Sequence, residues 1–166
     1  MKLFVRVAAI IERDGAILTH RSEQRGVVYY ALPGGHLEAG ETTVTCLERE
    51  LMEEFGIEVV VGRLLYLAEG MFLGGRKQPK PKHEIVFYYR ATLCEPDGVV
   101  RSREEPRIYA HWLPLAGALE QLFPAWLRLH LPEAATSGWN VPTSHIIADE
   151  RDPEHSTVQR TELSAL

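Results

Sequence analysis

The chain has 166 residues, and 18 Lys and Arg stand against 23 Asp and Glu, which gives a formal net charge of -5. This length favours one domain that buries most of its surface. The negative charge argues against a protein that mainly coats nucleic acid, so no stable nucleic-acid binding is expected. The two cysteines, Cys46 and Cys94, have no metal-binding spacing, which predicts reduced thiols rather than a disulfide scaffold or a zinc site.

No membrane segment is expected. Charged residues interrupt the apolar residues at the N-terminus, and no apolar run approaches the ~20 residues of a membrane span. The sequence therefore predicts no membrane association and a cytoplasmic location.

The first third of the chain reads as strands. Residues 4–11 and 16–21 are rich in apolar and β-branched residues, and Asp14-Gly15 lies between them, which predicts a hairpin. A third strand is expected over residues 27–32 and should end at Pro33-Gly34-Gly35. Strand character returns over residues 59–69.

An amphipathic helix is predicted between Thr42, the expected N-cap, and Gly56, the expected left-handed end. Its apolar face should dock on a core through Val44, Leu47, Leu51 and Phe55. The opposite face should carry three carboxylates at i, i+3 and i+4 spacing, those of Glu50, Glu53 and Glu54.

These three carboxylates need an explanation, because like charges at this spacing destabilise a helix by a few tenths of a kcal/mol per pair. An ordinary solvated acidic face is one interpretation. The preceding Gly34 and Gly35 permit close backbone approach, so carbonyl oxygens can join the carboxylates. A set of hard oxygen ligands of this kind suits Mg²⁺ or Mn²⁺.

The same stretch carries a family motif. Read from Gly35, it fits G-x5-E-x7-R-E-U-x-E-E-x-G-U, with U aliphatic, at all nine specified positions: Gly35, Glu41, Arg49, Glu50, Leu51, Glu53, Glu54, Gly56 and Ile57. This is the Nudix box, and the chain resembles a Nudix hydrolase. The resemblance implies an α/β fold, a Nudix-type α/β/α sandwich with a mixed central sheet, over residues 1–131. Residues 132–166 are expected to be a C-terminal extension, partly docked or flexible.

The resemblance also implies roles for the motif residues. Glu50, Glu53 and Glu54 would bind Mg²⁺ or Mn²⁺ together with the Gly34 carbonyl. Arg49 would orient these carboxylates by charge-assisted hydrogen bonds, and Glu41 would support the loop. The general base stays open among five glutamates: Glu53, Glu54, Glu84, Glu104 and Glu105.

Substrate contacts are expected outside the motif. Residues 70–82 are broken by glycine and proline, and their cations, Arg76, Lys77, Lys80 and Lys82, could meet a phosphate chain. A mobile solvated loop is the alternative. Arg21 and Tyr30 are candidates for holding a base or a phosphate, with an ion pair and core packing as equal alternatives.

The later elements are less distinctive. A strand is expected over residues 83–92, opened by Glu84, which is either a ligand or base or simply solvated. After a charged connector with Glu104 and Glu105 come a strand over residues 108–113 and a helix near residues 115–131, kinked at Pro124. Cys46 is expected to be a packing residue, because nearby carboxylates raise the pKa of a thiol.

The sequence therefore predicts a divalent-metal-dependent pyrophosphohydrolase for a nucleoside diphosphate linked to another moiety. Nucleoside di- or triphosphates are the favoured substrates, giving the nucleoside monophosphate. Nucleotide sugars, ADP-ribose and dinucleoside polyphosphates are alternatives, and a homodimer stays open. A nucleotide-sensing module without turnover is an alternative of another class, which the complete set of box carboxylates disfavours.

Overall fold

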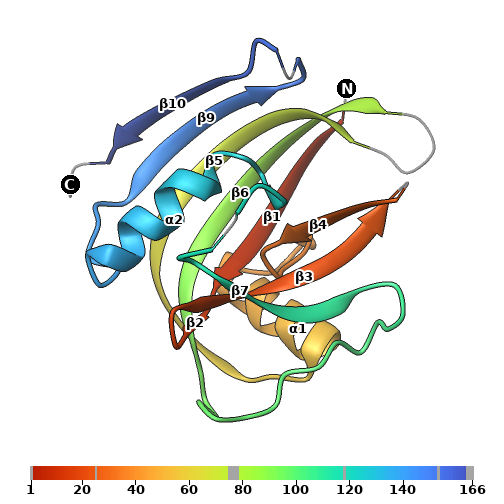
Figure 1. The fold of residues 1–166 in the computed structure, drawn as a ribbon, viewed down its shortest axis with the longest axis vertical. Coiled ribbons are helices and arrows are strands. Elements are labelled where there is room, and N and C mark those ends of the chain that lie inside the picture. The colour runs from red at the N-terminus through yellow and green to blue at the C-terminus, as the bar shows by residue number, and fades with distance from the viewer. Residues whose placement is uncertain (1, 25, 75–78, 118, 153, 164–166) are drawn as a thin grey trace.

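The protein is a layered α/β structure built on a five-stranded mixed sheet (Figure 1). The computed structural model describes the chain except residues 1, 25, 75–78, 118, 153 and 164–166. The strand order is β1-β6-β5-β9-β10. These strands are β1 (Leu3–Ile10), β5 (Val59–Gly74), β6 (Lys80–Leu93), β9 (Ser144–Glu150) and β10 (Thr157–Glu162). The pairs β1–β6 and β5–β9 are parallel, whereas β5–β6 and β9–β10 are antiparallel.

A second sheet lies beside the first. It has the order β2-β3-β4-β8, and β7 also pairs with β3. Its strands are β2 (Glu12–Arg13), β3 (Ala16–Gln24), β4 (Val27–Ala31), β7 (Tyr109–Pro114) and β8 (Leu122–Phe123). The predicted turn is confirmed, since Asp14 and Gly15 have φ of 53° and 76°, as a two-residue type I′ hairpin requires.

Helix α1 (Thr43–Phe55) forms where the sequence predicts it. The Thr42 hydroxyl accepts the backbone N–H of Thr45, and Gly56 ends the helix in the left-handed conformation. These two features confirm both predicted caps.

The predicted division of α1 into an apolar and an acidic face is wrong in part. Val44 is 37% exposed, whereas the side chains of Glu50 and Glu54 are only 16% and 13% exposed. At 100° per residue, Glu54 falls within about 20° of Leu47, inside the buried arc. Val44 shares this arc and is exposed because it is the second residue of the helix. Two of the three carboxylates are therefore turned toward the protein rather than away from it.

The two helices cover opposite faces of the central sheet. Alternate residues of β1 point to opposite sides, so Val7 and Ala9 join one buried cluster with residues of α1. Ala8 and Ile10 join the other cluster, with residues of α2 (Leu127–Thr136). The sandwich expected from the sequence is thus formed around this sheet.

The structure differs from the sequence prediction after Pro114. The helix expected over residues 115–131 is wrong, because turns and β8 precede α2, which runs to Thr136 with Pro132 inside it. Leu115, Leu119 and Leu122 are buried nonetheless, so their helical spacing reflects burial in irregular backbone. Beyond α2, the chain adds β9 and β10 to the central sheet. No helix in the described ranges is long and apolar enough to cross a bilayer.

Candidate functional site

The glycine loop, Pro33-Gly34-Gly35, runs directly against β1. The backbone N–H groups of Ala9 and Val7 donate to the carbonyls of Pro33 and Gly35, at 2.8 and 2.9 Å. Gly34 has a φ of 143°, and a Cβ there would lie 2.1 Å from the Val7 carbonyl oxygen. Only glycine fits this position, because a side chain would meet backbone in a conformation that L-residues rarely adopt.

Two helix carboxylates rest on this loop. A Cβ on Gly35 would lie 2.0 Å from Cδ of Glu50, so the Glu50 carboxylate occupies the space that a side chain would take. The backbone N–H of Gly34 donates to Oε2 of Glu54 at 3.3 Å. The same oxygen lies 2.9 Å from Nε2 of His20, although this approach lacks the alignment of a hydrogen bond.

Arg49 connects the helix carboxylates to the loop region. Its guanidinium donates to Glu41 at 2.6 Å, to Glu50 at 3.0 Å and to Glu53 at 3.3 Å. The bond from Arg49 lowers the pKa of Glu41 to about 2, whereas burial raises the pKa of Glu50. One cation is thus shared by three carboxylates, which fixes their orientation by charge-assisted bonds.

The donor set of this region fits a hard divalent cation. It consists of carboxylate and carbonyl oxygens, and the charges of Glu53 and Glu54 add to the burial that raises the pKa of Glu50. Glu53 is 62% exposed, and no group of three acidic, His or Cys side chains converges as a preformed ion site in the described part of the chain. The residue types therefore suit Mg²⁺ or Mn²⁺ in a site open to solvent.

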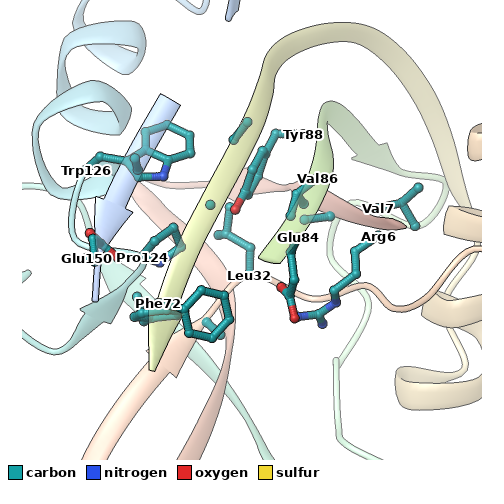
Figure 2. Close-up of a pocket in the computed structure, with 16 residues that line it drawn as sticks. Arg6, Val7, Leu32, Phe72, Glu84, Val86, Tyr88, Pro124, Trp126 and Glu150 are labelled. Atoms are coloured by element: carbon teal, nitrogen blue, oxygen red, sulfur yellow. The ribbon is translucent and has the colours of Figure 1, made fainter. Parts of the chain in front are cut away.

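A cavity lies on the α2 side of the central sheet, next to the glycine loop (Figure 2). We call it the aromatic cavity, because edge-to-face pairs of rings line it: Phe72 with Phe123 at 5.2 Å and Tyr88 with Trp126 at 5.3 Å. Its other lining residues include Arg6, Val7, Ala8, Leu32, Gly70, Glu84, Pro124, Ala148 and Glu150. We call Glu50, Glu53 and Glu54 the acidic region of α1. Leu32 lines the cavity and directly precedes the glycine loop, on which Glu50 and Glu54 rest, so the cavity and the acidic region of α1 are neighbours.

Glu84 belongs to the aromatic cavity and not to the acidic region of α1. It is buried, and Oε2 lies 3.5 Å from an Arg6 guanidinium nitrogen. Along β6 it has the same parity as Val86 and Tyr88, which face α2. His83 faces the other side of the sheet, as expected for adjacent strand residues.

The connector glutamates, Glu104 and Glu105, lie in the segment between β6 and β7. Glu104 pairs with Arg107, and Glu105 is exposed. The connector does dock on α1, because the backbone N–H of Arg103 donates to the Glu54 carbonyl at 2.7 Å. Glu104 raises the pKa of Arg107, and the charge of Glu54 adds to this effect, so this part of the connector lies near one helix carboxylate.

The predicted substrate contacts are dispersed. Arg21 and Tyr30 face each other in the β3–β4 pairing, and the Tyr30 ring packs on His111 at 4.8 Å. Lys82 lies across from Phe72 in the β5–β6 pairing, two residues before Glu84 on the same strand. Lys80 is exposed. Arg76 and Lys77 lie outside the described residues.

The thiol prediction is confirmed. Cys46 is fully buried, and burial together with Glu41 raises its pKa to about 11. A thiol in this state packs and does not act as a nucleophile.

The sequence reasoning missed His20 and most of the aromatic cavity. Arg6, Phe72, Trp126 and Glu150 come from β1, β5, the segment before α2, and β9. No local spacing links four segments so far apart in the chain. Only Glu84, a carboxylate opening an apolar strand, gave a signal.

A sandwich in which an acidic helix and a glycine loop enclose a carboxylate-rich site is the architecture of the Nudix domains. The NUDIX domain profile matches residues 2–134, and the chain belongs to this family.

Several known proteins resemble this chain in sequence or in fold. The CTP pyrophosphohydrolase of Escherichia coli K12 is 48% identical over 66 residues, which cover 37% of this chain and 47% of that protein. The match thus spans about half the length of that relative. The solved MutT protein from Bacillus halodurans has a TM-score of 0.69 at 20% identity, covering 95% of this chain and 97% of that chain, and shares the fold. The E. coli ORF135 protein has a TM-score of 0.56 at 28% identity, covering 84% and 94%.

Proposed function

We propose that the protein is a divalent-metal-dependent pyrophosphohydrolase that cleaves a phosphoanhydride bond of nucleoside di- or triphosphates and releases the nucleoside monophosphate. One observation carries this proposal: the acidic region of α1 and the aromatic cavity adjoin through Leu32 and the glycine loop. A nucleoside in the cavity would place its phosphates toward the helix carboxylates. Family membership and the relative named CTP pyrophosphohydrolase support the same reaction.

The residues of α1 would bind and orient the reacting groups. Glu50, Glu53 and Glu54, with the Gly34 carbonyl, would hold Mg²⁺ or Mn²⁺, which supplies charge neutralisation and lowers the pKa of water. Arg49 keeps the carboxylates in position through the bonds described above.

Among the five candidate glutamates, we favour two of the helix carboxylates as general base. Glu84 is buried beside Arg6 and Glu104 is paired with Arg107, whereas Glu53 and Glu54 lie on the helix proposed to hold the metal. We therefore assign proton acceptance from the attacking water to Glu53 or Glu54.

The substrate contacts and the cellular location are also proposals. Lys82 would contact the phosphates from beside Phe72, and Arg21, Tyr30, Arg76 and Lys77 are proposed contacts from the sequence alone. A cytoplasmic location is likewise proposed.

The test is release of the nucleoside monophosphate from a panel of nucleoside di- and triphosphates, nucleotide sugars and dinucleoside polyphosphates with Mg²⁺ or Mn²⁺. We expect turnover that EDTA abolishes and that falls at least ~100-fold in Glu53→Gln or Glu54→Gln. Glu48→Gln is the matched control, because Glu48 is exposed on the same helix. Nucleotide binding without any turnover would overturn the hydrolase and favour a sensor.

A further inference from the structure

The floor of the aromatic cavity has an open slot at Gly70. Glu84, Gly70 and Ala148 lie in one row across β6, β5 and β9. A Cβ added to Gly70 would meet no atom within 4 Å. The space above the Gly70 backbone is therefore open, with the Glu84 carboxylate on one side and the Ala148 methyl group on the other.

The walls around this slot suit a flat ring. Phe72 and Tyr88 stand on the same sheet face as Gly70, and each packs edge to face with a ring from the segment before α2. Aromatic walls bury a heterocycle by stacking and by edge contacts. They do not distinguish one base from another, because every base has a π-face.

Polar groups stand at two opposite sides of the cavity (Figure 2). On one side Arg6 lies beside Glu84, 3.5 Å apart. On the other side Glu150 accepts the backbone N–H of Ala125 through Oε1 at 3.1 Å. Among the described residues Glu150 has no second hydrogen bond, so its other oxygen is available to a ligand.

Glu150 lies outside the residues that match the family profile. It is the last residue of β9, and the family match ends at residue 134. The pairing of β9 with β5 sets Glu150 across from Phe72. Strand β9 thus delivers Ala148 and one carboxylate, that of Glu150, to a cavity built mainly by residues of the Nudix domain.

We propose that Glu150 is a specificity-determining residue that selects nucleobases carrying an exocyclic amino group, such as cytosine and adenine. Its free oxygen would accept a hydrogen bond from that amino group, as carboxylates do from cytosine N4. Uracil and hypoxanthine place a carbonyl oxygen at the same position, so two acceptors would face each other without a proton. This inference rests on the proposed function, because it concerns the substrate of that site.

The test compares kcat/KM for CTP and UTP at pH 8, an alkaline pH chosen because burial raises the pKa of Glu150, and repeats the comparison with ATP and ITP. We expect the wild type to favour the amino-bearing partner about 10- to 100-fold, the value of a hydrogen bond to a charged group. Glu150→Gln should bring the ratio within about threefold, mainly through KM, because an amide can donate or accept. Glu150→Asp should also lower the ratio, since it withdraws the charge by one methylene.

Asp149→Asn is the matched control. It changes the same charge one residue earlier, where the side chain lies on the other strand face and pairs with Arg151, so the ratio should stay at the wild-type value. A wild-type ratio near one, or a ratio retained in folded Glu150→Gln, would overturn the inference while leaving the hydrolase intact. If no nucleotide is turned over, the proposed function fails, and calorimetry with CMP and UMP still decides: equal affinities overturn the role of Glu150.

Discussion

Replacing the two neighbouring glycines of the loop by alanine should separate catalysis from stability. Gly35→Ala keeps an allowed backbone, but its Cβ would lie 2.0 Å from Cδ of Glu50. The carboxylate would have to retreat by roughly 1.5 Å to reach ordinary carbon contact. Misplacement of this size costs about 100-fold in rate, while the flexible end of one side chain moves at little cost in stability.

Gly34→Ala should have the opposite effect. Its φ of 143° is strained for any L-residue, and the clash at 2.1 Å is with the Val7 backbone, which is fixed in the central sheet. We expect a loss of about 2–4 kcal/mol in the free energy of unfolding. For a domain of this size that lowers Tm by about 5–15 °C.

The assay pairs thermal unfolding with release of the nucleoside monophosphate over a Mg²⁺ titration. Gly35→Ala should melt within a few degrees of the wild type and show a reduced kcat with a raised Mg²⁺ requirement. Wild-type kcat in Gly35→Ala, or a Tm loss equal to that of Gly34→Ala, would refute the idea that Glu50 needs the space at Gly35.

Three further changes probe the cavity, the thiols and the Arg49 pair. Gly70→Val should raise KM for nucleotides at least about tenfold without lowering Tm, because its side chain enters open space in the cavity; unchanged KM would place the nucleoside elsewhere. A thiol reagent at pH 8 should titrate only the exposed Cys94 in the native protein, because Cys46 is buried and its pKa there is about 11. Both thiols should react after unfolding, and two reactive thiols in the native protein would contradict this. Since Arg49 lowers the folded pKa of Glu41 from 4.5 to about 2, the pair stabilises the fold above pH 4.5 and loses this effect as pH falls toward 2. The Tm gap between wild type and Glu41→Gln should therefore close over that interval, and a constant gap would argue against the pair.

Local signals predicted the first half of the fold well. Thr42 and Gly56 bound α1 because each supplies chemistry that a helix end requires, and Asp14-Gly15 does the same for a hairpin. Long-range partners carry no such signal. In β9 the buried residues are Ser144, Ile146 and Ala148. One is polar and one is only weakly apolar, so the sequence shows no clear alternation along this strand.

The site was predictable only where one element contains it. Glu50, Glu53 and Glu54 sit on a single helix, and spacing brings them together. That Glu50 and Glu54 are turned inward depends on the loop at Gly34 and Gly35, which spacing cannot report. The aromatic cavity is assembled from separate strands, and sheet pairing alone makes it.

The pairing of β9 with β5 has a consequence for the open edge of the central sheet. β9 covers the β5 edge along residues 66–72, although the matched domain ends at residue 134. A chain cut there would bare a row of unsatisfied amide and carbonyl groups in the middle of its main sheet. Open edges of this kind recruit strands from other molecules, so the C-terminal segment also guards the Nudix domain against aggregation.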